Sequence, residues 1–399
     1  MRVGLKDLTW SVYVPALLFA TGIGAIGAVQ VLAAVQVGAS DALASALVAG
    51  AAIVSILFTV PVGTAINRLG DRRAMTVATL GVAVTVVATA LSLALPGAWS
   101  LPMFIVSMMA RAPAMVAWSL ARQALVAEAV EPVLLGRAMT ALGGMQRMGT
   151  LLGPLAGALV LVHLPLWGVY VLGLICAVLA TLMLYLTRPL SPRNRDDSPA
   201  EDNLREPAAV RWRAVWLAGT SIVVLTVARI GQPILVTLWG THLGWNEAQI
   251  SLLMALGAGI ELLALAPGGR MKDSLGRSPV LACCLTGFGA GFGLMVLWSG
   301  SWGLLTALVV MSLGNGLASG INMTIGADLS PATGRARFLS IWSLFNQVGT
   351  VLAPLIISGM LLVASLPWAI VSLGLLSWTG VAWTTAVAGR TGLPGRRRG

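Results

Sequence analysis

Charged residues are scarce in this chain. Only 10% of its 399 residues are Asp, Glu, Lys or Arg, whereas 57% are hydrophobic and the mean hydropathy is +0.90. Soluble domains carry about 25% charged residues, so this composition excludes a water-soluble globular protein. The chain also lacks the ten-residue alternation of apolar and polar residues that marks a membrane barrel. We therefore expect an all-α membrane protein.

Residues that commonly carry catalysis or bind metals are equally few. The three cysteines, Cys176, Cys283 and Cys284, all fall in apolar segments and are expected to be small buried side chains. The two histidines, His163 and His242, are not part of any cluster with Asp or Cys at catalytic spacing. A phosphate-binding loop of the Walker type is absent as well. We predict no enzyme activity, no metal, no cofactor and no direct use of ATP.

Long apolar runs, by contrast, are abundant. A run of about 18 residues or more can cross a bilayer as a helix. The first run is too long for the core of a signal peptide and is expected to be retained. The twelve predicted spans lie near residues 10–35, 43–66, 74–96, 101–123, 138–162, 166–187, 214–239, 248–268, 279–299, 302–325, 338–363 and 367–389.

Basic residues occur in every second break between these spans. The breaks near 36–42, 97–100, 163–165, 240–247, 299–302 and 364–367 contain no Lys or Arg. This asymmetry follows the positive-inside rule and predicts that both termini are cytoplasmic. The net charge of +11 is then a consequence of topology. We therefore expect contact with membrane lipid, for which the basic tail is suited, and no nucleic-acid partner.

The chain divides into two related halves. Residues 188–212 are polar, charged and proline-bearing, which indicates a cytoplasmic linker between residues 1–187 and residues 213–399. The segment GRAMTALGGMQRMGTLLGP (136–154) matches ARFLSIWSLFNQVGTVLAP (336–354) at a constant shift of 200 residues, from Pro154 to Pro354. Internal repeats of this kind are typical of secondary transporters.

Two polar segments, PVGTAINRLGDRRAM (61–75) and GGRMKDSLGRS (268–278), repeat between the second and third spans of each half. Their glycine spacing and basic residues resemble the signature of the major facilitator superfamily, and the resemblance covers nearly the whole chain. It implies twelve helices in two six-helix bundles and a cytoplasmic latch between the halves. The implied latch residues are Gly63, Asn67, Arg68, Gly70, Asp71, Arg72, Gly269, Asp273, Gly276 and Arg277.

The first of these segments departs from the family pattern. Asn67 stands where an Asp is customary, and Asp71 stands where a basic residue is usual. Either the first latch is weaker or Asp71 replaces the missing acid. The alternative is that both segments are only positively charged cytoplasmic loops.

The fifth span carries a stripe of small residues. Gly149, Gly153 and Gly157 recur every four residues around Pro154, so they share one helix face on which a neighbouring helix can approach closely. In the family this pattern resembles a motif associated with export by antiport, although Ala158 replaces one of its usual glycines. Helix packing without any bearing on transport direction is the alternative.

Ionisable residues inside a span cost at least ~2.5–3.5 kcal/mol at its centre, so each is a functional suspect. The four that stand out are Arg111, Arg147, Arg229 and Glu261. Arg122 lies nearer a cytoplasmic end, where its side chain can extend to the interface.

The resemblance implies that spans one, four, seven and ten line a central cavity. Arg111 and Arg229 would then lie on opposite walls and could hold a carboxylate or phosphate, or each could bind within its own half. Arg147 either faces the cavity or pairs with span four. Glycine and proline in GQP (231–233) predict a helix break beside Arg229. Further polar residues expected at the cavity are Gln30, Gln232 and Asn315.

Glu261 is the only carboxylate well inside a span. Burial favours its protonated form and a nearby cation favours its charged form. Competition between water and Arg229 would let Glu261 load and release a proton, whereas a permanent Arg229–Glu261 ion pair is the alternative.

These features predict a secondary transporter that resembles drug/proton antiporters: a monomer that exports a small amphipathic or drug-like molecule in exchange for protons. The intramembrane arginines support an alternative, an uptake symporter or facilitator for an organic anion or sugar. A lipid flippase is less favoured. The excess of Arg over Lys is typical of a high-GC genome, and we expect the plasma (inner) membrane of a bacterium.

Overall fold

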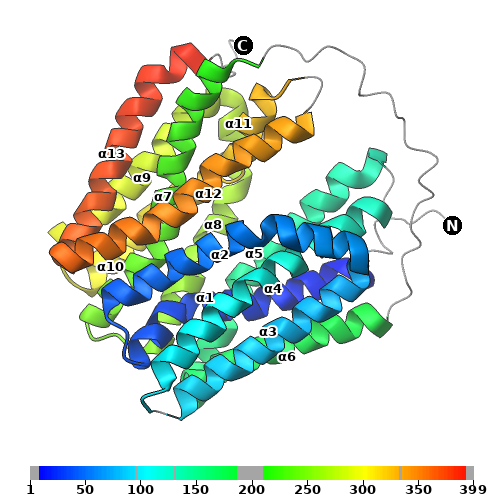
Figure 1. Ribbon diagram of the computed structural model, residues 1–399. Helices are drawn as coiled ribbons and strands as arrows, with labels where there is room; N and C mark the ends of the chain where they lie inside the picture. Colours follow the sequence, from blue (N-terminus) through cyan, green and yellow to red (C-terminus); the bar gives the residue numbers. More distant parts are fainter. Residues whose placement is uncertain (1–8, 96, 130–131, 187–209, 332–334, 392–399) are drawn as a thin grey trace. The chain divides into compact units, whose positions relative to one another are not determined.

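A computed structural model describes residues 9–95, 97–129, 132–186, 210–331 and 335–391. Within these ranges the regular secondary structure is helical throughout (Figure 1). The helices are η1 (Thr9–Tyr13), α1 (Val14–Gln36), α2 (Asp41–Leu69), α3 (Asp71–Ala94), α4 (Ser100–Ala129), α5 (Pro132–His163), α6 (Trp167–Leu186), α7 (Trp212–His242), α8 (Glu247–Leu275), α9 (Arg277–Leu297), α10 (Ser301–Leu317), α11 (Ile321–Leu329), α12 (Arg335–Val363) and α13 (Leu366–Thr391).

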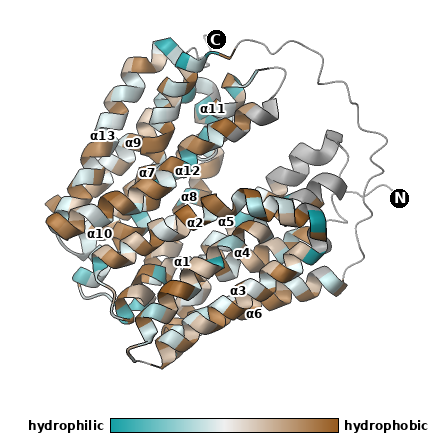
Figure 2. Ribbon diagram, in the orientation of Figure 1, coloured by the Kyte–Doolittle hydropathy of each residue, from teal (hydrophilic) through white to brown (hydrophobic). Residues whose placement is uncertain are grey.

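The helices have the length and composition of membrane spans. Eleven candidate spans reach 18 residues or more, with α10 and α11 counted as one, and a shorter apolar helix covers Trp167–Met183 of α6. Hydrophobic residues extend along most of each helix (Figure 2). The prediction of an all-α protein with about twelve membrane-crossing segments is confirmed.

The chain forms two compact units. Unit 1 contains residues 1–196 and 245–256, and unit 2 contains residues 197–244 and 257–399. Most of the linker predicted at 188–212 lies outside the described residues, and α7 already begins at Trp212. The predicted boundaries at 187 and 213 remain predictions.

The sequence repeat corresponds to equivalent helix contacts in the two units. A Cβ atom added at Gly149 of α5 would lie 2.8 Å from the carbonyl carbon of Ala20 in α1. A Cβ atom added at Gly349, 200 residues later in α12, would lie 2.8 Å from the carbonyl oxygen of Val223 in α7. In both units, therefore, the fifth helix of the half approaches the first at the backbone.

Each polar segment turns at one glycine. Gly70 joins α2 to α3 with φ 81°, and Gly276 joins α8 to α9 with φ 91°. Residues with a side chain rarely adopt positive φ, so glycine is required for these tight turns. The repeated glycine spacing of the sequence thus has a direct backbone cause.

The tenth predicted span, 302–325, is not one helix. α10 ends at Leu317 and α11 begins at Ile321, with Gly320 in the left-handed conformation at φ 76°. Glycine has low helix propensity and tolerates this conformation. The nearby Gly314 and Gly316 weaken the helix before the break.

The helix break predicted at GQP (231–233) is absent, which corrects the sequence interpretation. α7 continues through Pro233 to His242. Proline removes one backbone hydrogen bond, but membrane helices tolerate it when neighbouring groups compensate. Gly231 and Gln232 are both buried against other helices, because Gly231 approaches Leu373 of α13 and Gln232 approaches Ser312 of α10.

Candidate functional site

The break between α10 and α11 is held by cationic side chains from two other helices. Arg229 of α7 donates from Nε to the side-chain oxygen of Asn315 at 2.5 Å, and from Nη2 to the carbonyl of Ala318 at 3.2 Å. Lys272 of α8 donates to the carbonyl of Ser319 at 2.5 Å. Carbonyls at a helix end lack partners in the helix itself, and the helix dipole makes this end favourable for cations. Arg229 and Lys272 therefore stabilise the unwound segment.

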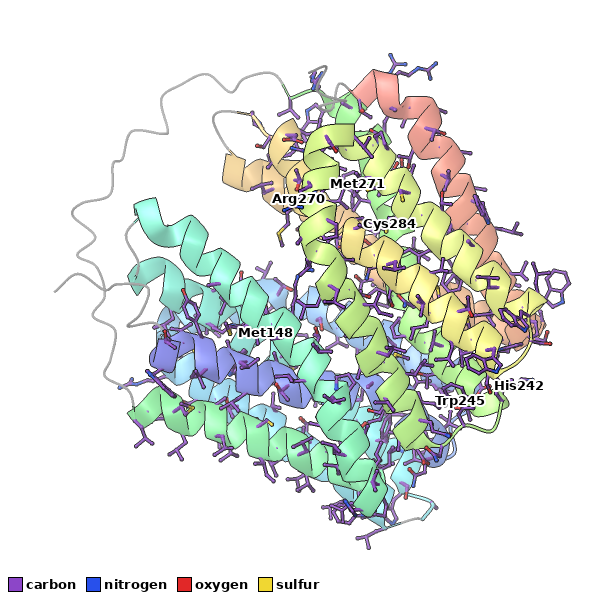
Figure 3. All side chains as sticks on the ribbon, turned by 180° about the vertical axis from the view of Figure 1, so that it is seen from behind. Met148, His242, Trp245, Arg270, Met271 and Cys284 are labelled. Atoms are coloured by element: carbon purple, nitrogen blue, oxygen red, sulfur yellow. The ribbon has the colours of Figure 1, made fainter. Side chains whose placement is uncertain are left out.

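Glu261 belongs to the same region of unit 2. It is half-buried on α8. A Cβ atom added at Gly316 would lie 2.6 Å from the carbonyl oxygen of Glu261, so α8 and α10 touch at the backbone beside the break. Cys284 of α9 (Figure 3) lies close enough for both Arg229 and Glu261 to interact electrostatically with its thiol. Arg229 and Glu261, which the sequence analysis already paired, thus lie in the same region of unit 2 as Asn315.

Gln232 lies one helical turn from Arg229 on α7. It is 6% exposed, and its Nε2 is 3.5 Å from the hydroxyl of Ser312, which is fully buried in α10. Gln232 therefore joins α7 to α10 and has no open approach to solvent. This position favours a packing role.

Replacing Arg229 by methionine is expected to destabilise the protein by about 2 kcal/mol, because the Ala318 carbonyl and the Asn315 side chain lose a charged donor. The measurement is the shift of thermal unfolding in detergent. Arg270→Met is the matched control, since Arg270 is exposed near the end of α8 (Figure 3) and its loss is expected to stay within about 0.5 kcal/mol. Equal shifts for the two variants would contradict the stabilising role of Arg229.

Arg111 of unit 1 lies in a different environment. It is 6% exposed, its guanidinium carbon is 5.9 Å from the centre of the Tyr170 ring on α6, and its Nη1 is buried without a hydrogen-bond partner in the described part of the chain. The hydroxyl of Tyr170 is likewise buried and without a partner there. Arg111 is therefore directed into the interior of its own unit. Its contact with substrate stays a prediction.

The other polar residues of unit 1 that the sequence singled out do not form one cluster. Gln30 of α1 is half-buried and donates to the sulfur of Met108 on α4, at 3.7 Å. Arg147 of α5 is exposed. Arg122 does not reach the interface as expected, since it is 2% exposed and its guanidinium lies over the ring of Trp118, 4.5 Å from the centre. Cation–π attraction compensates part of its burial.

Two of the cysteines are buried as expected, whereas Cys283 is exposed, which corrects the prediction. Successive residues of a helix point in different directions, and Cys284 takes the inward position. Among the described residues, no group of three or more His, Cys, Asp or Glu is arranged to hold a metal ion.

The small-residue stripe of α5 meets the backbone of α1. A Cβ atom added at Gly153 would lie 2.5 Å from both the amide nitrogen of Ala25 and the carbonyl oxygen of Thr21. Real Cβ contacts of this length essentially do not occur. Glycine is thus the residue that allows this approach, and the packing role predicted for the stripe has a definite geometry.

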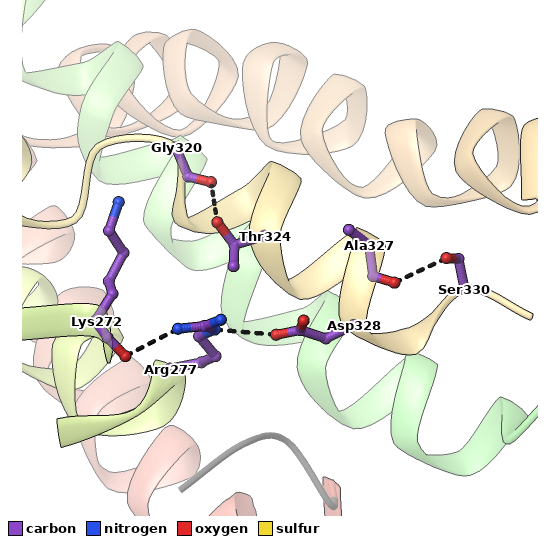
Figure 4. Close-up of polar contacts among 7 residues, drawn as sticks. All are labelled: Lys272, Arg277, Gly320, Thr324, Ala327, Asp328 and Ser330. Carbon is purple, nitrogen blue, oxygen red and sulfur yellow. Dashed lines mark hydrogen bonds and ion pairs between the residues drawn. The ribbon is translucent and has the colours of Figure 1, made fainter. Parts of the chain in front are cut away.

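The second polar segment forms a set of contacts at the end of α11 (Figure 4). Arg277 pairs with Asp328 at 3.0 Å and donates from Nη1 to the carbonyl of Lys272 at 2.9 Å. The side chains of Asn67, Asp71, Arg72 and Asp273 lie outside the described part of the structure, whereas Arg68 is exposed. These two contacts of Arg277 lie within unit 2, and a latch between the halves stays a prediction.

Sequence reasoning missed Lys272, Asp328 and Tyr170. Lys272 and Asp328 fell in predicted loops, and Tyr170 looked like an ordinary apolar residue of span six. An acid beside the end of span ten, near a basic segment, was the available signal for Asp328. No sequence signal marked Tyr170, because its role depends on which helix it faces.

Comparison with known proteins agrees with this architecture. The sequence matches the profile of the Major Facilitator Superfamily twice, over residues 12–238 and 217–395. The tetracycline resistance protein, class H, of Pasteurella multocida is 26% identical over 139 residues. That match covers 34% of this chain and 34% of the relative, so the chain spans about a third of the curated protein it matches.

Solved structures resemble the whole chain. A POT family transporter in complex with 5-aminolevulinic acid has a TM-score of 0.77 at 12% identity, covering 98% of this chain and 96% of that one. A D-xylose-proton symporter has a TM-score of 0.70 at 15% identity, covering 98% of each chain. At these identities the likeness concerns the fold alone.

Proposed function

Because the chain belongs to the major facilitator superfamily, whose members are membrane carriers and not enzymes, we propose that it exports a small amphipathic or drug-like molecule in exchange for protons. The observation that carries the proposal is the backbone contact between α5 and α1 at Gly149 and Gly153. These glycines belong to the small-residue stripe of span five that resembles the antiport motif. Their contact holds α1, the first helix of the unit, against α5, the fifth. The limited similarity to a tetracycline resistance protein supports the same direction of transport.

Proton coupling is assigned to Glu261. The proposal is supported by the backbone of Glu261, which lies beside Gly316 shortly before the unwound segment between α10 and α11, and by Arg229, which is anchored to the same segment. A carboxyl group near a cation changes its protonation when either water access or the cation position changes. A small rearrangement of the segment would therefore be linked to proton uptake and release at Glu261.

The second candidate function is uptake of an organic anion. Arg111 favours it, since a buried guanidinium with an unpartnered N–H suits a carboxylate. Both candidates share alternating access between two units and differ in the direction of the substrate relative to protons.

Transport by the purified protein in liposomes distinguishes them. With a pH gradient imposed in either direction, amphipathic cations, neutral compounds and monocarboxylates are supplied on one side and their accumulation is measured. We expect substrate to move against the direction of proton flow. Movement in the same direction as protons would support the uptake symporter, and transport that ignores the pH gradient for every class would contradict proton coupling.

A further inference from the structure

Two adjacent polar groups in the interior of unit 1 have incomplete hydrogen bonding. Nη1 of Arg111 and the hydroxyl of Tyr170 are both buried without a hydrogen-bond partner among the described residues. Arg111 is 6% exposed and Tyr170 is fully buried. The two side chains lie together, with 5.9 Å from the guanidinium carbon to the ring centre. A buried polar group without a partner is unfavourable, so a bound group that accepts hydrogen bonds from both would stabilise this interior.

The positive charge of Arg111 also lacks an opposite charge from the surrounding helices. α1, α5 and α6 contain no Asp or Glu. On α4 itself, Glu128 is about 25 Å away at 1.5 Å per residue. In the neighbouring α2 and α3 the acidic residue is the first of the helix, Asp41 and Asp71 respectively. A cation buried in an apolar bundle requires a counter-ion, and these helices provide none nearby.

A third polar group lies at the same level. Gln30 of α1 meets the Met108 sulfur, three residues before Arg111 on α4. On the other side of α1, a Cβ atom added at Gly173 of α6 would lie 3.1 Å from Cγ1 of Ile26. Tyr170 lies about one turn before Gly173, and Gln30 lies about one turn after Ile26, so Tyr170 and Gln30 are at the same level. A thioether is a weak acceptor, so the amide loses little by turning to a stronger one.

From these contacts we propose that unit 1 binds one monoanionic group between Arg111 of α4 and Tyr170 of α6. Arg111 supplies the positive charge and an N–H donor, and the Tyr170 hydroxyl supplies a second donor. We propose that the Gln30 amide, which meets Met108 one turn before Arg111, supplies a third. The group is either a small inorganic anion such as chloride or the carboxylate of the transported molecule. Only the carboxylate form rests on the function proposed above.

The site offers several hydrogen-bond donors and one positive charge, which sets its selectivity. Small monovalent anions accept several N–H and O–H hydrogen bonds without a further charge to compensate. A cation would meet the Arg111 charge without a nearby carboxylate from the surrounding helices to oppose it. Divalent anions would exceed the single positive charge of the site.

Thermal unfolding of the purified full-length protein in detergent tests the proposal. At constant ionic strength, the sodium salt of a bulky sulfonate, which carries no carboxylate, is replaced stepwise by chloride, bromide or nitrate, or by acetate or benzoate. We expect a saturable rise of about 2 °C or more in the melting temperature, since a ligand that binds the folded state stabilises it by mass action. A rise with the inorganic ions identifies a free anion, and a rise with the carboxylates alone identifies the substrate group.

Three variants locate the effect. Arg111→Gln and Tyr170→Phe are expected to lose most of the response, while Arg229→Gln retains it because the guanidinium of Arg229 already bonds Asn315 and Ala318. Tyr170→Phe keeps the ring and is expected to fold even if Arg111→Gln does not. The proposal is overturned if no anion stabilises the wild type, or if Tyr170→Phe responds as fully as the wild type. Neither outcome depends on transport, so failure of the exporter proposal would be seen separately in the liposome assay.

Discussion

Gly153→Leu is expected to leave little folded protein in the membrane, and Gly153→Ala is expected to lower its melting temperature. The added Cβ atom would lie 2.5 Å from the Thr21 carbonyl oxygen and from the Ala25 amide nitrogen. These are backbone atoms of α1, so no side chain can move aside and the helices must separate. Overpacking of this kind typically costs about 1–3 kcal/mol, and a larger side chain increases the strain.

Gly143→Ala on the same helix is the matched control. No atom lies within 4 Å of a Cβ atom added there, and alanine is the better helix former by up to about 1 kcal/mol. Gly143→Ala is therefore expected to be neutral or slightly stabilising. Expression yield, monodispersity in detergent and melting temperature are compared for the three variants. A Gly153→Leu protein as stable as the wild type would show that α1 and α5 are not in close contact.

The second large effect concerns energy coupling. Glu261→Gln is expected to abolish accumulation driven by a pH gradient, because an amide cannot load and release a proton at this position. A difference of one pH unit across the membrane corresponds to about 1.4 kcal/mol per proton. When one proton is exchanged per substrate, this free energy supports a tenfold concentration ratio of the substrate. The variant is expected to lose that tenfold ratio while it still exchanges labelled for unlabelled substrate across the membrane.

Glu247→Gln is the control for the loss of a carboxylate from the same helix. Glu247 is exposed in the first turn of α8 and is expected to be unnecessary for coupling. If Glu261→Gln accumulates substrate like the wild type, the proton site lies elsewhere. If it neither accumulates nor exchanges substrate, Glu261 acts in binding, which contradicts a role confined to coupling.

The sequence determined the features that depend on composition and on local pattern. Few charges and long apolar runs require helices that satisfy their own backbone in lipid, and the repeated glycines around residues 70 and 276 specify tight turns with positive φ. The four-residue glycine spacing of span five indicated a contact face before any partner helix was known. These properties arise within one segment, so they can be derived from that segment.

The tertiary structure decided where side chains point and which carbonyls they reach. Pro233 looked like the break in a helix, yet the chain is continuous there and unwinds instead at Gly320 of the tenth span. The stability of that unwound segment comes from donors on other helices, Arg229 and Lys272, so no local pattern could reveal it. Tyr170 gains its importance in the same way, because its ring lies against the guanidinium of Arg111, which is two helices earlier in the sequence. Contacts between helices depend on packing of the whole unit, and this is the information that a single segment does not contain.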